Sequence, residues 1–253
     1  MIIDPQWSGP WFWSFVGLAI ICSLILVFVK APYGRHHRPG WGPQIPARLG
    51  WVVMETPSVV IMAWLAIAGH TTALTGFLLA CWLLHYVHRS FVYPFLTPNR
   101  GRTMPVVIAA MGAFFNCING AFNGLYLFHW APQQYDQSWM LTPVFVIGAI
   151  TFFCGMTINR QSDAILRRLR SGNAMDYKIP RGGLYRWVSC PNYLGETIEW
   201  LGWALMVWNP AGLAFLFWTL ANLMPRAISH HRWYRDRFAD YPPDRKAIVP
   251  GLL

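Results

Sequence analysis

The sequence predicts an all-α, polytopic membrane protein with seven transmembrane helices, its N-terminus outside and its C-terminus in the cytoplasm. Only 12% of the 253 residues are charged, whereas a soluble domain carries about 25% charged residues. Hydrophobic residues make up 55% of the chain, enough for about seven spans of roughly 20 residues each. The Lys and Arg residues fall only in alternate segments between the apolar ranges. This pattern excludes a soluble nucleotide-binding domain, a secreted module and a disordered scaffold.

Seven apolar ranges supply the predicted helices. They are Trp11–Val29, Gly50–Gly69, Thr72–Val92, Met104–His129, Leu141–Ile158, Tyr193–Val207 and Ala211–Pro225. The first has no basic stretch before it and no small-residue cleavage site, so we expect a retained helix and not a signal peptide. The last two are short and are separated by Trp208, Asn209 and Pro210, which predicts a tight hairpin.

The basic residues give the orientation. Of the 20 Lys and Arg residues, 4 follow the first range, 3 lie at the end of the third range (Arg89) or in the segment after it, 7 follow the fifth range and 6 follow the seventh. Basic flanks stay in the cytoplasm, so these four segments are predicted to be cytoplasmic. Two of them, Asn159–Arg186 and Arg226–Lys246, hold 13 of the 20. This concentration of basic residues is explained either by the positive-inside rule alone or by a binding region for a polyanionic ligand.

Several common sites are absent from the sequence. The basic residues that give the net charge of +10 lie beside the predicted spans, which argues against a nucleic-acid partner. Four of the five cysteines lie inside apolar ranges and no CxxC occurs, so we expect reduced thiols and no metal. His85 and His88 have the i, i+3 spacing of ligands but no third ligand nearby. The chain has no GxGxxG, GxxxxGK[ST], HExxH or GxSxG, which excludes Rossmann, P-loop, zincin and hydrolase-elbow sites.

Two polar residues of the spans are candidates for binding a substrate oxygen. Glu55 is ionisable at membrane depth, which marks a functional site by default. Desolvation favours the neutral form of the Glu55 carboxyl. A neutral carboxylic acid can donate a hydrogen bond, as one does in ketosteroid isomerase. The alternative is an interfacial carboxyl that bonds to the backbone opened by Pro57. Tyr86 is either a second donor to the same oxygen or a tyrosine of the interfacial belt.

Asparagines mark one face of the fourth span. Asn116, Asn119 and Asn123 stand at i, i+3 and i+7, so they share one side of a helix. Such a face either holds neighbouring helices together or lines a ligand cavity.

Three polar stripes lie on the cytoplasmic side of the later spans. The three stripes are Asn159, Asp163 and Arg170; Asn192, Glu196 and Glu199; and Arg226, His230 and Tyr234. The first set shares one helix face if the fifth span continues as a helix beyond Ile158. Each stripe alone is explained by a salt-bridge network. Together, beside the two most basic segments, the three stripes predict a binding site for a polar cofactor. Its cations would bind phosphates, its amides and acids would bind ribose and amide groups, and an aromatic ring would stack on a base.

At these residues the chain resembles the steroid 5α-reductase family (3-oxo-5α-steroid 4-dehydrogenases) along nearly its full length. The motifs that carry the resemblance are Glu55-Thr56-Pro57-Ser58, His85-Tyr86-Val87-His88-Arg89-Ser90-Phe91-Val92-Tyr93, Asn99-Arg100-Gly101-Arg102, Asn159 with Ser162-Asp163 and Leu169-Arg170, Ile179-Pro180-Arg181-Gly182-Gly183-Leu184, Asn192-Tyr193-Leu194-Gly195-Glu196, Glu199-Trp200, His230-His231-Arg232, and Tyr241-Pro242 with Arg245-Lys246-Ala247.

The resemblance implies an NADPH-dependent enzyme that reduces the 4,5 double bond of a 3-oxo-Δ4-steroid, with Glu55 and Tyr86 holding the C3 carbonyl. It implies one domain over 1–253, in which the first four spans form the steroid cavity and 159–253 binds the cofactor. The expected steroid contacts are Trp51, Phe115 and Trp200, with Asn119 of the asparagine face. The expected cofactor contacts are Asn159, Asp163, Arg170, Tyr177, Lys178, Asn192, Glu196, Arg226, His230 and Tyr234.

Two positions depart from the family pattern. Met54 stands where well-studied members have Gln, which bears on the finer steroid preference, and Lys178 stands where they have Arg, which keeps the positive charge.

Other functions stay open from the sequence. Related membrane reductases act on enoyl-CoA or polyprenol substrates and also polarise a carbonyl or alkene. An isoprenylcysteine-type methyltransferase would carry an Arg followed by paired glutamates near its end, and this tail has His230-His231-Arg232 instead. A transporter or receptor could use a buried acid and an asparagine face. We expect a monomer in the lipid bilayer, in the endoplasmic reticulum of a eukaryote or the inner membrane of a bacterium.

Overall fold

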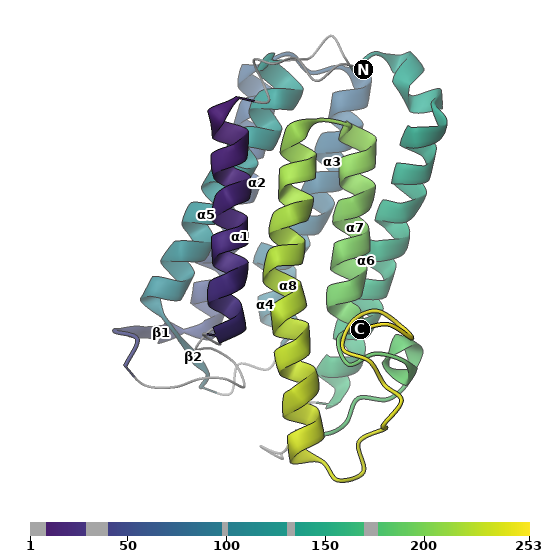
Figure 1. Cartoon of the computed structure of the whole chain (residues 1–253). Helices are drawn as coiled ribbons and strands as arrows, with labels where there is room; N and C mark the ends of the chain where they lie inside the picture. Colours follow the sequence, from purple (N-terminus) through teal and green to yellow (C-terminus); the bar gives the residue numbers. More distant parts are fainter. Residues whose placement is uncertain (1–8, 29–39, 98–100, 131–134, 170–176) are drawn as a thin grey trace. The chain divides into compact units, whose positions relative to one another are not determined.

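The computed structural model describes residues 9–28, 40–97, 101–130, 135–169 and 177–253. The chain forms two compact units, one made of Met1–Lys30 with Ile147–Leu253 and the other of Ala31–Val146. Both are built from long helices, as the sequence predicts, and the described strands are one short pair (Figure 1).

A strand pair and a helix pair organise the unit Ala31–Val146. Strands β1 (Gln44–Pro46) and β2 (Thr103–Pro105) pair antiparallel, with Gln44 opposite Pro105. Helices α2 (Ala47–Ala68) and α5 (Val106–Leu125) follow these strands directly. The pairing therefore places the first turns of α2 and α5 beside each other, and the two helices run in the same direction.

Small residues allow α2 and α5 to approach closely. A Cβ atom placed on Gly112 would lie 2.2 Å from Cγ of Met54, and one placed on Gly124 would lie 2.7 Å from Cδ1 of Leu65. Only glycine fits at such contacts, and close backbone approach at small residues is the usual way in which membrane helices pack.

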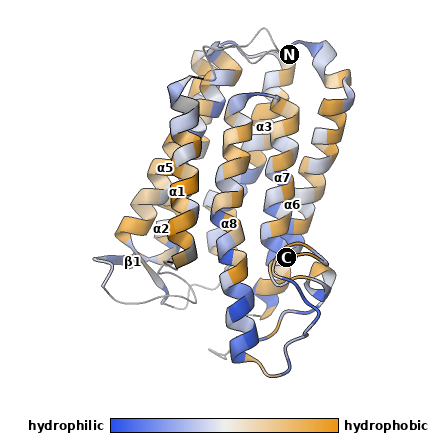
Figure 2. Ribbon diagram, in the orientation of Figure 1, coloured by the Kyte–Doolittle hydropathy of each residue, from blue (hydrophilic) through white to orange (hydrophobic). Residues whose placement is uncertain are grey.

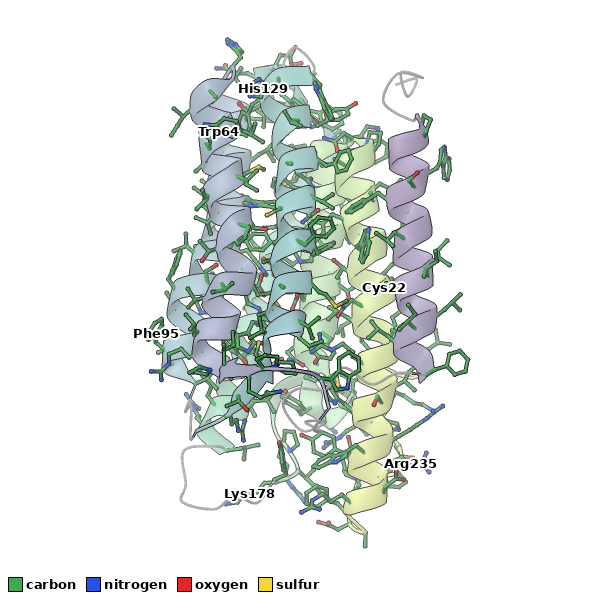
Figure 3. The ribbon with its side chains drawn as sticks, turned by 90° about the vertical axis from the view of Figure 1, so that its left-hand side faces the viewer. Cys22, Trp64, Phe95, His129, Lys178 and Arg235 are labelled. Atoms are coloured by element: carbon green, nitrogen blue, oxygen red, sulfur yellow. The ribbon has the colours of Figure 1, made fainter. Side chains whose placement is uncertain are left out.

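The predicted span Thr72–Val92 consists of two helical segments. Helix α3 (Ala73–Val87) begins with a capping box, in which the Thr72 side chain accepts from the Thr75 amide and the Thr75 side chain accepts from the Thr72 amide. It continues as the π-helix η2 (His88–Val92) and then as α4 (Tyr93–Leu96). Segments η3 (Tyr126–Trp130) and η5 (Gln137–Leu141) complete the unit. Figure 3 shows Trp64 and His129 at one end of this unit and Phe95 at the other.

The other unit contains α1 (Pro10–Phe28), α6 (Pro143–Leu169, from Ile147 onward), η6 (Gly183–Arg186), α7 (Pro191–Val207) and α8 (Pro210–Arg237). Helix α1 packs along α8, where the Trp218 indole donates to the Phe15 carbonyl oxygen over 2.9 Å. Helices α7 and α8 lie side by side (Figure 1). The predicted hairpin between them is confirmed: Trp208 is left-handed with φ 43°, and the Asn209 side chain caps α8 by accepting from the Gly212 amide.

Helix α8 is longer than the sequence prediction, which ended this span at Pro225. The helix runs to Arg237 and contains Pro225 in its interior. Figure 2 shows that its last turns are hydrophilic, whereas its first turns are mostly apolar. The prediction was wrong here because hydropathy marks where a helix stops being apolar, and polar residues continue a helix equally well.

Four glycines bring α6 and α7 into backbone contact. They stand seven residues apart on each helix, Gly148 and Gly155 on α6 and Gly195 and Gly202 on α7. A Cβ atom on Gly155 would lie 2.2 Å from the Glu199 nitrogen, and one on Gly195 would lie 2.4 Å from the Asn159 nitrogen. The antiparallel helices therefore meet at their backbones, and polar residues at the end of this contact are forced together.

Four described helices are long and apolar enough to cross a membrane: Ala47–Ala68, Val106–Trp130, Pro143–Leu169 and Pro210–Arg237. A shorter apolar helix covers Trp13–Leu26. The protein is thus a helical membrane protein. The count of seven spans and the direction of the termini stay predictions.

Candidate functional site

Glu55 and Tyr86 lie on the facing sides of α2 and α3. Below them, the Trp82 indole donates to the Ser58 carbonyl oxygen over 3.0 Å. Above them, Arg89 Nε lies 3.9 Å from Glu55 Oε1. Trp82 and Tyr86 are spaced i and i+4 and therefore share one face of α3, and Arg89 follows in η2. Because Trp82 and Arg89 both reach α2, Tyr86 between them faces α2 at about the level of Glu55.

The surroundings of Tyr86 are those of a buried residue. Its side chain is 3% exposed. Its ring centroid lies 4.8 Å from that of Trp82 and 5.0 Å from that of His85. An interfacial-belt tyrosine would instead point its hydroxyl to the membrane surface, so this packing favours the reading of Tyr86 as a donor inside the protein.

Asn116 of α5 connects the Glu55 region to the neighbouring helix. Its side-chain nitrogen donates to the Met54 carbonyl oxygen over 2.8 Å and lies 3.3 Å from Glu55 Oε2. Its side-chain oxygen accepts from the Ser58 hydroxyl over 2.8 Å. Asn116 therefore holds α2 and α5 together, next to Pro57, whose ring removes a backbone hydrogen bond from α2.

Asn119 on the same face differs from Asn116. Its side-chain oxygen and its carbonyl oxygen both accept from the Asn123 side chain, over 3.1 and 3.0 Å. Its side-chain nitrogen is buried and has no hydrogen-bond partner among the residues that the structure describes. A buried donor without a partner is costly, so this nitrogen suits a polar atom of a bound ligand. Asn116 thus holds neighbouring helices together, and the contact of Asn119 with a ligand stays a prediction.

Arg89 was missed as a site residue in the sequence. Its guanidinium carbon lies 4.8 Å from the ring centroid of Trp51 and 5.0 Å from that of Tyr93. In the sequence Arg89 counts only as a basic residue at the end of a span. Its position in the π-helix η2, a type of segment common at functional sites, could not be read from hydropathy.

Phe115, another predicted steroid contact, is half-buried on α5.

In the other unit, the predicted cofactor residues of α6 and α7 are in direct contact. The Asn159 side chain donates to the Asn192 carbonyl oxygen over 2.9 Å and lies 3.4 Å from Glu196 Oε2. The Asn192 side chain donates to Asp163 Oδ1 over 3.2 Å. The expected continuation of the fifth span beyond Ile158 is confirmed as far as Leu169. Arg170 lies outside the described residues.

The polar stripe of α8 meets α7 at Tyr193. The Tyr193 hydroxyl lies 3.1 Å from His230 Nε2. The guanidinium carbon of Arg226 lies 5.3 Å from the Tyr193 ring centroid, and an Arg226 nitrogen donates to Asn222 Oδ1 over 3.0 Å. Tyr193 thus fixes two predicted cofactor residues, although the sequence did not single it out.

The remaining predicted cofactor residues lie toward the C-terminal end of α8. Tyr234 is 3% exposed and stacks on Tyr241, with ring centroids 5.4 Å apart and planes 10° from parallel. Tyr177 packs edge-on against Trp233. Lys178 is exposed, and Figure 3 shows it at the same end of this unit as Arg235. One face of Tyr234 is therefore covered by protein.

Trp200 lies in the aromatic core of this unit. It is 1% exposed, and its ring centroid lies 4.3 Å from that of Phe215 and 6.3 Å from that of Phe152. This is the packing of a core residue, and its predicted contact with a steroid stays a prediction.

A hydroxyl-centred cluster attaches the C-terminal tail to this unit. We call Ser189, His231 and Tyr241 the tail cluster. The Ser189 hydroxyl lies 2.7 Å from His231 Nδ1 and 2.6 Å from the Tyr241 hydroxyl, and it also donates to the Lys246 carbonyl oxygen. Burial raises the pKa of Tyr241, so this phenol stays protonated. The cluster connects the start of α7, the end of α8 and the tail.

Replacing Ser189 by Ala is expected to lower thermal stability by about 1–3 kcal/mol, because buried polar atoms of His231 and Tyr241 lose their shared partner. Thermal denaturation in detergent measures the change. Ser229→Ala is the matched control, since the Ser229 hydroxyl is buried without a hydrogen-bond partner among the described residues. Equal denaturation temperatures for the two variants would contradict the assigned role of Ser189.

Comparison with known proteins shows the family of the chain. Residues 102–253 match the family model described as 3-oxo-5-alpha-steroid 4-dehydrogenase. The chain is 42% identical over 236 residues to steroid 5-alpha-reductase DET2 of Arabidopsis thaliana, covering 90% of each chain. It is 41% identical over 248 residues to 3-oxo-5-alpha-steroid 4-dehydrogenase 2 of Homo sapiens, covering 94% of this chain and 95% of the relative. The chain belongs to the 3-oxo-5-alpha-steroid 4-dehydrogenase family.

Membership in this family confirms the resemblance inferred from the sequence motifs. The chain is therefore an enzyme, an oxidoreductase of steroid metabolism with apolar helices of membrane-spanning length. The regions that match these two relatives include both units, because each match extends over nearly the full length of the chain.

Proposed function

We propose that the protein reduces the 4,5 double bond of 3-oxo-Δ4-steroids to give 5α-dihydrosteroids, with NADPH as the reductant. The observation that supports the proposal is that α3 and η2 reach α2 on both sides of Tyr86, through the Trp82–Ser58 hydrogen bond and the approach of Arg89 to Glu55, with Tyr86 buried, in a chain of this family. Two O–H donors that converge on one point are suited to binding a carbonyl oxygen.

Glu55 and Tyr86 act on the C3 oxygen of the steroid. In the enone the C3 carbonyl is conjugated with the 4,5 double bond, so hydrogen bonds to O3 draw electrons from C5. As C5 gains a hydride, negative charge develops on O3, where the two donors already stand. Donors placed at the site of developing charge stabilise the transition state more than the ground state. A proton then adds at C4.

The residues proposed for NADPH fit the chemistry of that molecule. The set offers cations for phosphates, amide and carboxylate groups for ribose and carboxamide, and aromatic side chains. Its described members are Asn159, Asp163, Tyr177, Lys178, Asn192, Glu196, Arg226, His230 and Tyr234, and Arg170 is proposed with them. When bound, NADPH supplies the hydride. The chain's own contribution is to bind and orient it, with Asn159 and Asn192 held by the α6–α7 contacts.

Replacing Asn192 by Ala is expected to raise the KM for NADPH at least fivefold while the KM for steroid changes less than twofold. The reason is that the Asn192 side chain orders Asp163, and both belong to the proposed cofactor set. Steady-state kinetics with each substrate varied in turn gives the two values. Asn222→Ala, on α8, is a milder control because the Asn222 side chain accepts only from Arg226 among the residues that the structure describes. An unchanged KM for NADPH in Asn192→Ala would contradict the assignment.

The steroid is proposed to contact Trp51, Phe115, Asn119 and Trp200. Fused apolar rings bind best to aromatic and apolar walls with few polar groups. The buried side-chain nitrogen of Asn119 is such a polar group, since it is a donor that a steroid oxygen could accept from. Met54, next to Glu55, is the proposed site of the finer steroid preference.

Seven spans, with the N-terminus outside and the C-terminus cytoplasmic, are the proposed topology. The confinement of all 20 Lys and Arg residues to alternate segments supports it. A lipophilic steroid then enters from the bilayer, and a charged cofactor enters from the cytoplasm. We propose a monomer, located in the endoplasmic reticulum in a eukaryote or in the inner membrane in a bacterium.

Turnover of progesterone and of a long-chain enoyl-CoA, each with NADPH, tests the proposed substrate class. Purified protein should reduce progesterone to a 5α-dihydro product and leave the thioester unchanged. Reduction of the thioester alone would identify a related membrane reductase instead. Absence of NADPH oxidation with either substrate, together with absence of NADPH binding, would contradict the enzyme assignment and favour a transporter or a methyltransferase.

A further inference from the structure

Arg89 is held in an unusual setting beside the proposed proton donor. Its guanidinium carbon lies 4.8 and 5.0 Å from the ring centroids of Trp51 on α2 and Tyr93 on α4, two rings that pack edge-on against each other with centroids 6.3 Å apart. Its Nε is 3.9 Å from Glu55 Oε1, which is longer than a hydrogen bond. The Arg89 and Glu55 side chains are only 17% and 12% exposed. A positive charge thus lies next to the carboxyl and in contact with two aromatic rings.

The length of this contact is informative. A structural ion pair normally closes to a hydrogen bond, and for Arg often a bidentate one. Here cation–π contacts with two neighbouring rings hold the guanidinium in place. The charge therefore acts on Glu55 through space.

We propose that Arg89 is a positioning residue that compensates the negative charge formed on Glu55 during steroid reduction. This inference rests on the proposed function, in which Glu55 donates to the C3 oxygen. It adds a third residue to the Glu55–Tyr86 pair, and it acts through Glu55, not through contact with the substrate.

The electron balance of the step shows why a cation is needed there. A hydride adds to C5, the 4,5 π pair becomes a 3,4 π bond, and the carbonyl π pair moves to O3. O3 takes the proton of Glu55, whose O–H pair stays on the carboxylate. The steroid is reduced and NADPH is oxidised to NADP⁺. C4 then gains a proton from water, which leaves hydroxide, and O3 returns its proton to Glu55. The carboxylate exists between these two transfers, beside the guanidinium of Arg89.

Three variants test the charge. Arg89→Gln should lower kcat at least tenfold, whereas Arg89→Lys, which keeps the charge, should retain at least a third of it. Arg48→Gln is the matched control: Arg48 also lies over an aromatic ring, 5.0 Å from the Phe95 centroid, and donates to the Pro94 carbonyl oxygen. It should keep kcat within twofold. Loss in Arg89→Lys equal to that in Arg89→Gln would overturn the proposal.

A double-mutant cycle separates charge compensation from a structural role. With Glu55→Gln already in place no carboxylate forms, so adding Arg89→Gln should change kcat less than threefold. Residues that act through one another show such non-additivity. If Arg89→Gln costs tenfold in both backgrounds, Arg89 acts independently of Glu55 and the proposal is wrong. If Glu55→Gln itself keeps full activity, the proposed function of Glu55 fails instead, and the two failures are thereby distinguished.

Equilibrium binding gives a readout that needs no turnover. Binding of progesterone without NADPH, followed by tryptophan fluorescence, should change less than threefold in Arg89→Gln, because the charge forms only during the reaction. A loss of binding greater than tenfold would mean that Arg89 shapes the substrate site and would overturn the proposal.

Discussion

Replacing Glu55 by Gln, or Tyr86 by Phe, is expected to lower the rate of steroid reduction at least tenfold, a loss of about 1.4 kcal/mol of transition-state stabilisation or more. Each change removes one O–H donor and keeps the size of the side chain. The effect should appear in kcat more than in KM, because charge on O3 is greatest in the transition state.

Binding of NADPH should be nearly unchanged in both variants, which equilibrium titration of the purified proteins measures. Two matched controls exist in the same unit. Asp136→Asn makes the same carboxyl-to-amide change at an exposed helix cap, and Tyr135→Phe removes the hydroxyl of another buried tyrosine. Both controls should keep activity within twofold. Full activity of Glu55→Gln and Tyr86→Phe would show that these residues do not hold the carbonyl.

Replacing Gly155 by Ala is expected to lower the free energy of unfolding by about 3 kcal/mol and to weaken NADPH binding at least tenfold. The new Cβ atom would lie 2.2 Å from the Glu199 nitrogen and 2.6 Å from the Gly195 carbonyl oxygen, so the α6 and α7 backbones must separate. Overpacking at rigid contacts costs about 1–3 kcal/mol and occasionally more. Separation also pulls Asn159 from the Asn192 carbonyl oxygen.

Gly17→Ala is the matched control for this prediction. It lies in helix α1 of the same unit, and its new Cβ atom would meet nothing within 4 Å. Alanine favours helix over glycine by about 1 kcal/mol, so this variant should be as stable as the parent protein or more so. Thermal denaturation in detergent and titration with NADPH give both quantities. A Gly155→Ala protein that matches Gly17→Ala in both would contradict the close α6–α7 contact.

The helices and several site residues could be predicted from local pattern. Apolar length located each long helix to within a few residues, apart from the polar ends of α6 and α8. The i, i+4 spacing placed Asn159 with Asp163 and Asn192 with Glu196 on single faces, and the structure brings these faces into contact. Such features depend on residues within two helical turns of one another, which is the range over which sequence periodicity is informative.

Features that depend on long-range contacts could not be predicted. The contacts of Arg89 with Trp51 and Tyr93 depend on the π-helix and on a second helix. Ser189 meets Tyr241 across 52 residues of sequence, and no local pattern connects them. The seven-residue glycine spacing of α6 and α7 is visible in the sequence. Glycine is common in membrane helices, so this spacing alone does not indicate a helix–helix contact.

Transfer of a labelled hydride tests the central claim most directly. Purified protein is incubated with progesterone and NADPH that carries deuterium at the transferable position, and the product is analysed by mass spectrometry and NMR. The account predicts a 5α-dihydro product with one deuterium at C5 and with C4 protonated from water. Deuterium at C3, which would mean reduction of the carbonyl itself, or an unreduced steroid after NADPH has bound, would contradict it.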